Sequence, residues 1–313
     1  MGALVLALNP SIDAEWRVAR ARWEEKNVIQ SERRWAGGKG VNVARWLRHL
    51  GGEPRLLLPL GGATWKELAG HLRRERLTFK SVALSEATRV NVIVTTAEGR
   101  QLRFNPPGPK LSKVEWRAIL WEVGGMLERA SCLVLSGSLP RGVSASAYAE
   151  LIRLARSKGV KTILDCDGKA LAAAVAAHPF LVKPNEHELE EWLGRRISSP
   201  TGLIRAALKL SAQTKGWVLV SQGRRGALLA NQELKVKLSA RPHRVKPVNT
   251  VGAGDAMVAA VAQQIELGNP PGDWLRRGVA AGTSATQCAA GELPSTVLIH
   301  GILKQVRTDS LRD

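Results

Sequence analysis

Residues 248–260 read Val-Asn-Thr-Val-Gly-Ala-Gly-Asp-Ala-Met-Val-Ala-Ala, so that a Gly-Ala-Gly turn leads directly into an apolar helical stretch. Glycine lets backbone N–H groups converge on one point because no Cβ obstructs them, and the start of a helix adds a positive dipole. We therefore interpret Gly252, Ala253 and Gly254 as a cradle for a phosphate-sized anion.

Asp255 follows this turn, and its carboxylate has two interpretations. An acidic residue in the first turn of a helix can simply be a favourable charge near the helix dipole. A carboxylate beside an anion site is repulsive, however, unless it has a task there, such as taking a proton from an attacking hydroxyl. We favour the second interpretation, in which Asp255 is a general base.

A second glycine turn opens another predicted helix at residues 36–45, Ala-Gly-Gly-Lys-Gly-Val-Asn-Val-Ala-Arg. This turn is not a Walker A loop, because the glycine spacing and the Ser or Thr after the lysine are absent. Such a turn is also consistent with a plain strand-to-helix connection. Lys39 and Asn42 at the mouth of a helix nevertheless suit the recognition of hydroxyl or phosphate groups.

The third motif, Lys-Pro-Asn-Glu-His-Glu at residues 183–188, ends a predicted buried strand and opens a helix. Asn185 and Glu188 are three residues apart, which is the spacing of a helix-capping arrangement. The same pair could hold water and Mg²⁺ near transferred phosphates, since Mg²⁺ favours one or two carboxylates together with water. The spacing does not decide between the two.

Strand-like apolar runs alternate with helical patterns from about residue 36 onward, which predicts a doubly wound, mostly parallel α/β sheet with helices on both faces. The predicted strands are 1–8, 132–136, 161–165, 180–183 and 217–221, and the predicted helices are 41–50, 64–75, 145–158, 186–193, 202–214 and 253–267. Segments 14–35 and 88–104 lack helical periodicity, and the second is predicted to be a hairpin that turns at Glu98-Gly99. We expect these segments to form a small β-sheet lid on a single domain of residues 1–313.

Composition narrows the class of protein. The formal net charge of +19 permits nucleic-acid binding, but the basic residues are spread along the chain rather than clustered. The cysteines Cys132, Cys166 and Cys288 have neither disulfide nor zinc-ligand spacing, and we expect buried, reduced thiols. No apolar run is long enough to cross a bilayer and the first residues do not form a signal peptide, so we expect a soluble cytoplasmic protein.

Taken together, these motifs resemble the PfkB (ribokinase-like) family of carbohydrate kinases. Residues 36–42 look like its first signature and residues 249–255 like its second. Four further segments, 88–91, 105–109, 136–140 and 183–188, follow the opening Leu-Asn-Pro-Ser-Ile-Asp of residues 8–13 in the family's order. The opening segment, Thr-Arg-Val-Asn at 88–91 and Ser-Gly-Ser-Leu-Pro at 136–140 are most similar to the branch that acts on phosphorylated ketoses, 1-phosphofructokinase and tagatose-6-phosphate kinase. Thr-Arg-Val-Asn followed by Asn-Pro-Pro-Gly-Pro favours 1-phosphofructokinase.

The resemblance implies an ATP- and Mg²⁺-dependent kinase that converts fructose 1-phosphate to fructose 1,6-bisphosphate, working as a homodimer through the lid. It implies that Asp255 is the general base and that Gly252, Ala253 and Gly254 stabilise the transferred phosphoryl group. The other implied roles are substrate binding by Asp13, Gly38, Lys39, Asn42, Arg89 and Asn91, nucleotide binding by Lys183, Asn185, Ser221, Gly223 and Gly226, and Mg²⁺ binding by Glu188 and, through water, Asn185.

Two residues depart from the family pattern. Asn249 stands where much of the family has Asp, as the phosphosugar branch tolerates, and Asp167 replaces a small hydroxyl residue expected near the nucleotide phosphates. Alternative substrates are tagatose 6-phosphate, fructose 6-phosphate, an unphosphorylated sugar or a nucleoside. A non-catalytic phosphosugar-binding or nucleic-acid-binding protein is the alternative from a different class.

Overall fold

The computed structural model describes residues 2–311 and contains two separate sheets. The larger has ten strands in the order β14-β13-β12-β11-β10-β9-β8-β1-β4-β5. The seven strands from β11 to β5 run parallel to one another, and β12, β13 and β14 complete the sheet in antiparallel pairs. This architecture confirms the predicted fold class.

The ten strands of the large sheet are short and mostly buried. They are β1 (Gly2–Leu6), β4 (Arg55–Gly61), β5 (Thr78–Leu84), β8 (Ala130–Ser136), β9 (Lys161–Asp165), β10 (Leu181–Val182), β11 (Trp217–Ser221), β12 (Ala227–Asn231), β13 (Val236–Arg241) and β14 (Arg307–Ser310). Met1, in the predicted strand 1–8, and residues 312 and 313 of the predicted domain lie outside the described residues. The predicted strand 180–183 is reduced to two residues.

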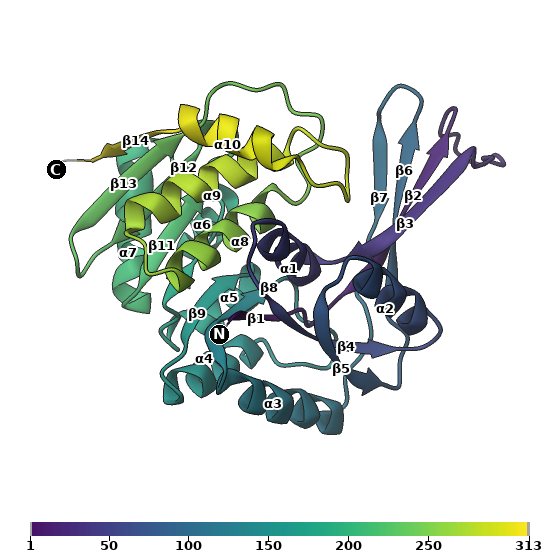
Figure 1. Cartoon of the computed structure of the whole chain (residues 1–313), viewed down its shortest axis with the longest axis horizontal. Coiled ribbons are helices and arrows are strands. Elements are labelled where there is room, and N and C mark those ends of the chain that lie inside the picture. The colour runs from purple at the N-terminus through teal and green to yellow at the C-terminus, as the bar shows by residue number, and fades with distance from the viewer. Residues whose placement is uncertain (1, 312–313) are drawn as a thin grey trace.

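Helices cover both faces of this sheet (Figure 1). One face packs against α1 (Lys39–His49), α2 (Thr64–Arg74), α8 (Ala253–Glu266), α9 (Pro271–Ala285) and α10 (Thr296–Gln305). The other packs against α3 (Lys113–Leu127), α4 (Ala147–Ser157), α5 (Gly168–Val175), α6 (Glu186–Leu193) and α7 (Pro200–Thr214). Alternate residues of β1 serve the two layers: Val5 belongs to the first core and Leu6 to the second.

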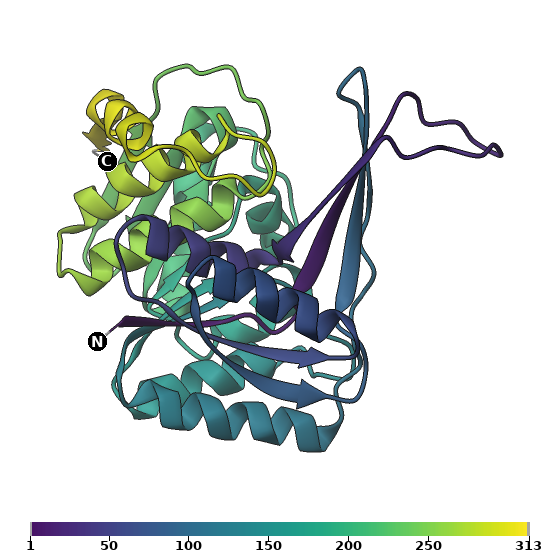
Figure 2. The same cartoon turned by 45° about the vertical axis from the view of Figure 1, so that its right-hand side comes forward.

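The small sheet has the order β3-β2-β6-β7 and takes its strands from two distant parts of the chain. These strands are β2 (Ser11–Val18), β3 (Ser31–Gly37), β6 (Arg89–Thr96) and β7 (Gln101–Phe104). The β6–β7 hairpin turns through Glu98-Gly99, as the sequence predicts, with Gly99 at φ 80°. The β2–β3 and β6–β7 hairpins extend away from the body of the molecule (Figure 2), so the small sheet forms a lid-like projection.

The three cysteines are free thiols. Cys132 and Cys166 are buried as expected, whereas Cys288 is partly exposed, because it follows the end of α9 in a loop. Within residues 2–311 no helix is long and apolar enough to span a membrane.

Candidate active site

A pocket of about 290 Å³ lies at the topological switch point of the large sheet, where β1 and β8 end. From β1 the chain proceeds to β4 and β5 on one side, and it later returns to β8 on the other side of β1. The carboxyl ends of two such strands are the usual ligand site of an open α/β sheet. The pocket is lined there by Asn9 and Pro10 after β1 and by Ser136, Gly137 and Ser138 at the end of β8.

Arg89 and Asn91 of the lid strand β6 also line this pocket. The Arg89 guanidinium donates hydrogen bonds of 2.9 Å to the carbonyl oxygens of Asn9 and Pro106, while its Nε is buried without a partner among the described residues. Asn91 donates to Asp13 Oδ1 at 2.8 Å, and its own Oδ1 is also buried and unpaired there. Buried polar atoms are normally satisfied, so these atoms mark a place for a ligand.

Asp255 lies in the first turn of α8, and its side chain is only 5% exposed. Asn42 of α1 donates a hydrogen bond of 2.8 Å to its Oδ2. Burial raises the pKa of Asp255 to about 6, with a further rise from Asp165, while Asn42, Lys39 and Lys183 act in the opposite direction. A carboxylate with a pKa near 6 is a stronger base than an exposed one and still ionised at neutral pH, which suits proton abstraction.

Asp165 at the end of β9 organises the cations around Asp255, and the sequence interpretation overlooked it. It is 1% exposed, lies 3.0 Å from Nζ of Lys183 and 3.8 Å from Nζ of Lys39, and accepts a hydrogen bond from Ser136. Burial alone would raise the pKa of Asp165, but the two lysines bring it below its usual value. Burial lowers the pKa of Lys39, yet Asp165 and Asp255 outweigh this effect and the pKa rises, so Lys39 stays charged.

The start of α8 has the features of an anion cradle. Gly252 adopts a left-handed conformation with φ 83°, and no side chain among the described residues caps the helix. The N–H groups of a helix's first turn then remain free to bind an anion. Lys183 approaches the same turn, because a Cβ on Gly254 would lie 3.6 Å from its Nζ.

The residues predicted to bind a nucleotide gather at the ends of β10 and β11. Asn185 and Ser221 form an isolated parallel bridge, and Ser221 donates its N–H to the carbonyl of Pro184 at 3.0 Å. After Ser221 the chain makes the short η1 helix (Gly223–Arg225) and passes through Gly226 at φ 93°. A Cβ on Gly226 would lie 1.9 Å from the carbonyl oxygen of Ala240, so only glycine fits there.

Asn185 and Glu188 form a capping box at the start of α6. Asn185 Oδ1 accepts from the Glu188 N–H at 2.9 Å, and Glu188 Oε2 accepts from the Asn185 N–H at 2.8 Å. Of the two interpretations of residues 183–188, the helix cap is therefore present in the structure. Within residues 2–311 no three His, Cys, Asp or Glu side chains converge as metal ligands. Mg²⁺ held mainly by phosphates and water still fits, because this cap uses only one oxygen of the Glu188 carboxylate.

The two residues that depart from the family pattern have definite positions. Asn249 Oδ1 accepts a hydrogen bond from the Val251 N–H at 3.1 Å, which shapes the turn before α8. Asp167 lines the same pocket as Lys39 and Gly137. Its carboxylate adds to the factors that raise the pKa of Lys39.

The structure thus gathers most of the predicted residues around one site. Gly38, Lys39, Arg89 and Asn91 line the pocket, Asn42 contacts Asp255, and Lys183 lies beside Gly254. Asn9, Ser136 and Ser138 were present in recognised motifs but had no assigned role. A buried base, an uncapped helix start and a cationic polar pocket define a phosphotransferase that acts on a sugar hydroxyl.

Comparison with known proteins agrees with this class. Residues 8–296 match the model of the pfkB family carbohydrate kinases, and the chain belongs to that family. It is 37% identical over 284 residues to the ATP-dependent 6-phosphofructokinase isozyme 2 of Escherichia coli (strain K12), covering 90% of this chain and 91% of that one. It is 31% identical to a Haemophilus influenzae 1-phosphofructokinase over 97% of both chains.

A solved structure of phosphofructokinase-2 from Escherichia coli in complex with fructose-6-phosphate is similar in fold. Its TM-score is 0.88 at 33% identity, covering 97% of this chain and 99% of that one. The protein is thus an ATP-dependent sugar kinase of the phosphofructokinase type, as the sequence motifs predict.

Proposed function

We propose that this kinase transfers the γ-phosphoryl group of ATP to the 6-hydroxyl of fructose 1-phosphate, giving fructose 1,6-bisphosphate. The observation that carries the proposal is that Asp255, in the first turn of the uncapped helix α8, interacts electrostatically with Lys39, which lines the same pocket as Arg89. The 1-phosphofructokinase relatives and the Thr-Arg-Val-Asn motif at 88–91 support fructose 1-phosphate as the acceptor.

In this mechanism Asp255 takes the proton from the acceptor hydroxyl as its oxygen attacks the γ-phosphorus. The bond from that phosphorus to the β–γ bridging oxygen breaks, and ADP leaves. The N–H groups of Gly252, Ala253 and Gly254 stabilise the charge on the equatorial oxygens. Lys183 adds positive charge beside this turn.

Arg89 recognises the phosphate already on the sugar. Its half-buried guanidinium donates to two carbonyl groups and leaves Nε without a partner among the described residues, and a planar fork suits phosphate oxygens. Lys39 interacts with the carboxylates of Asp165 and Asp255. We therefore assign it to the transferred phosphoryl group as well as to the sugar phosphate. Asp13, Gly38, Asn42 and Asn91 bind the sugar hydroxyls.

ATP lies over Lys183, Asn185, Ser221, Gly223 and Gly226, which the structure brings to the ends of β10 and β11. Glu188, and Asn185 through water, hold the Mg²⁺ that shields the phosphate charge. This role requires no more than one free carboxylate oxygen, which the capping box leaves on Glu188.

Fructose 6-phosphate is the second candidate substrate, because one relative with 37% identity is a 6-phosphofructokinase. Both sugar phosphates carry a phosphate at one end and a primary hydroxyl at the other, so the same cationic pocket suits either. The test is kcat/KM with Mg·ATP for fructose 1-phosphate, fructose 6-phosphate, tagatose 6-phosphate, fructose and ribose. A higher value for fructose 6-phosphate than for fructose 1-phosphate would overturn the acceptor assignment.

The lid supports a homodimer. It exposes large apolar side chains that a monomer leaves in water: Trp23, Val28, Ile29, Leu102 and Phe104. Exposed apolar patches usually mark an interface, and the lid of a second copy is the partner that would cover these side chains. Light scattering should give twice the chain mass of 33.9 kDa, and a monomeric mass at micromolar concentration would contradict a lid dimer.

A further inference from the structure

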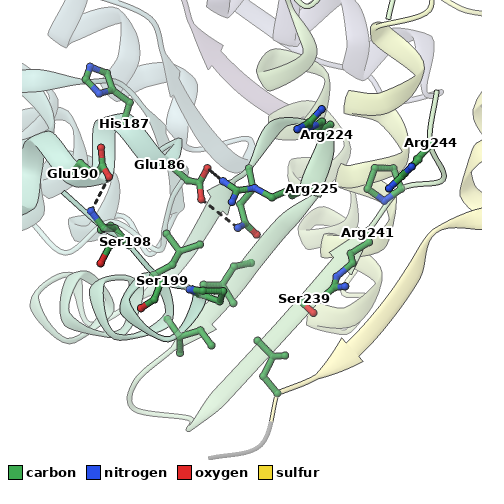
Figure 3. Close-up of a pocket in the computed structure, with 18 residues that line it drawn as sticks. Glu186, His187, Glu190, Ser198, Ser199, Arg224, Arg225, Ser239, Arg241 and Arg244 are labelled. Carbon is green, nitrogen blue, oxygen red and sulfur yellow. Dashed lines mark hydrogen bonds and ion pairs between the residues drawn. The ribbon is translucent and has the colours of Figure 1, made fainter. Parts of the chain in front are cut away.

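A groove of about 870 Å³ lies beside the turn at residues 221–226, which contains η1 and is proposed to bind the nucleotide (Figure 3). One wall is formed by His187 of α6 and by Ser199 just before α7. The opposite wall is formed by Ser239 and Arg241 of β13 and by Arg244 in the segment that follows. The groove is therefore large enough to hold a nucleotide or a sugar bisphosphate.

The groove concentrates positive charge. Arg224, Arg225, Arg241 and Arg244 all line it. Arg225 is ion-paired with Glu186, but Arg224, Arg241 and Arg244 have no carboxylate partner in the described part of the chain. Three unpaired guanidinium groups around one cavity repel one another, and an anion between them would remove that repulsion.

The lining also includes Glu190, whose Oε1 accepts a hydrogen bond of 2.7 Å from the Ile197 N–H, but two further features of the groove suit an anion. The first turn of the fifteen-residue helix α7 reaches the groove at Ser199 and Pro200, so the positive end of its dipole lies at the wall. The Oγ of Ser239 is buried and has no hydrogen-bond partner among residues 2–311. A hydroxyl without a partner can donate to a phosphate oxygen.

This groove is separate from the catalytic pocket. The two cavities share no lining residue. Leu228 and Leu203 of the groove belong to the α3–α7 layer, whereas Asp255 lies on α8 in the opposite layer. The groove nevertheless contacts the nucleotide region, because Gln222 and Arg224 alternate with Ser221 and Gly223 along the same turn.

We propose that this arginine groove binds a small phosphorylated metabolite at a site distinct from the catalytic pocket. Its ligand carries at least one phosphate on a polar body, such as a nucleotide or a sugar phosphate. Binding there draws Arg224 and Arg225 toward the ligand and so changes the η1 turn, which couples the groove to ATP affinity.

Surface arginines are abundant in a chain with a net charge of +19, so the test compares two double variants that each remove two arginines. The variant R241A/R244A removes two groove arginines. The control R117A/R153A removes two exposed arginines on α3 and α4 that belong to neither cavity. Neither pair is part of the catalytic machinery, and both variants should keep the wild-type kcat and unfolding midpoint.

Isothermal calorimetry with enzyme saturated by a non-hydrolysable ATP analogue and by whichever sugar phosphate the wild type turns over detects binding outside the catalytic pocket. Inorganic phosphate, AMP and fructose 1,6-bisphosphate serve as separate probes, which distinguish bare phosphate, nucleotide and sugar phosphate. We expect at least one probe to bind the wild type with one equivalent and a Kd below about 1 mM. Affinity should fall at least about 10-fold in R241A/R244A and stay within about 2-fold in the control.

Two results would overturn the proposal. One is the absence of saturable binding by all three probes to the saturated wild type. The other is equal affinity in the wild type and R241A/R244A. Because the readout is heat of binding rather than turnover, neither result depends on which sugar the kinase phosphorylates.

Discussion

Asn42 and Asp255 lie 213 residues apart in sequence, yet the Asn42 amide donates a hydrogen bond of 2.8 Å to the Asp255 carboxylate. This bond joins the first turns of α1 and α8, each of which has a glycine at positive φ as its N-cap. It also stabilises the charged form of the carboxylate and so opposes the rise in pKa that burial causes. The two glycine motifs of the sequence therefore form one site.

The pH dependence of the reaction should follow the pKa of Asp255. The base acts when deprotonated, so kcat/KM should fall about 10-fold per unit as the pH drops below about 6. Asn42→Ala removes a hydrogen bond that lowers this pKa, so the acidic limb of the profile should move to higher pH. An unchanged limb in the variant would show that Asp255 does not control the profile.

Asp165→Asn should shift the same limb in the opposite direction. The Asp165 carboxylate raises the pKa of Asp255 through charge repulsion, and the amide has no charge. Asp165→Ala should in addition destabilise the fold by about 3–5 kcal/mol, because Lys183 is left as a buried charge without its partner. Thermal unfolding and pH–rate profiles measure the two effects, and limbs that move in the same direction in Asn42→Ala and Asp165→Asn would refute this electrostatic account.

Arg89 and Lys39 should differ in their kinetic effects. Arg89→Ala loses charge-assisted hydrogen bonds to the sugar phosphate, so KM for the phosphorylated ketose should rise about 10- to 100-fold. KM for unphosphorylated fructose should not change. Lys39→Ala should mainly lower kcat, because Lys39 lies beside Asp165 and near Asp255. If Arg89→Ala weakens fructose as much as its phosphate, the assignment of Arg89 is wrong.

Two glycines of the turn at residues 221–226, Gly223 and Gly226, allow a matched pair of substitutions. Gly226 has φ 93° and ψ −130°, and its Cβ would collide with Ala240, so Gly226→Ala should cost at least about 2 kcal/mol of stability and raise KM for ATP. Gly223 has φ 56° and open space around it, so Gly223→Ala should cost only about 1 kcal/mol. Equal unfolding midpoints for the two variants would contradict the proposed fit.

The sequence pattern predicts the layered α/β class well because its strongest signals are local. Strands Lys161–Asp165 and Trp217–Ser221 and helix Glu186–Leu193 are predicted to the residue, since each is a short periodic run with clear boundaries. Strand β4 was missed although five of its residues are consecutive apolar residues or proline, because Pro59 within the run argues against a strand.

The ion pairs of the site could not be predicted, because they depend on long-range contacts. Asp165 ends an ordinary buried strand, and nothing nearby in sequence indicates that Lys39 and Lys183 converge on it. The arginine groove is likewise invisible in sequence, since Arg224, Arg241 and Arg244 look like scattered surface charges until β12 and β13 pair. By contrast, Asp255 and the glycine turn were identifiable because the whole motif is contiguous.

Turnover by Asp255→Asn tests the central claim most directly, because the amide keeps the shape of the side chain but cannot accept the proton. We predict that kcat with Mg·ATP falls at least about 10²-fold on every sugar phosphate that the wild type uses, while the Kd for ATP measured by calorimetry stays within about 2-fold. A kcat close to the wild-type value, in a variant that binds ATP normally, would contradict the account.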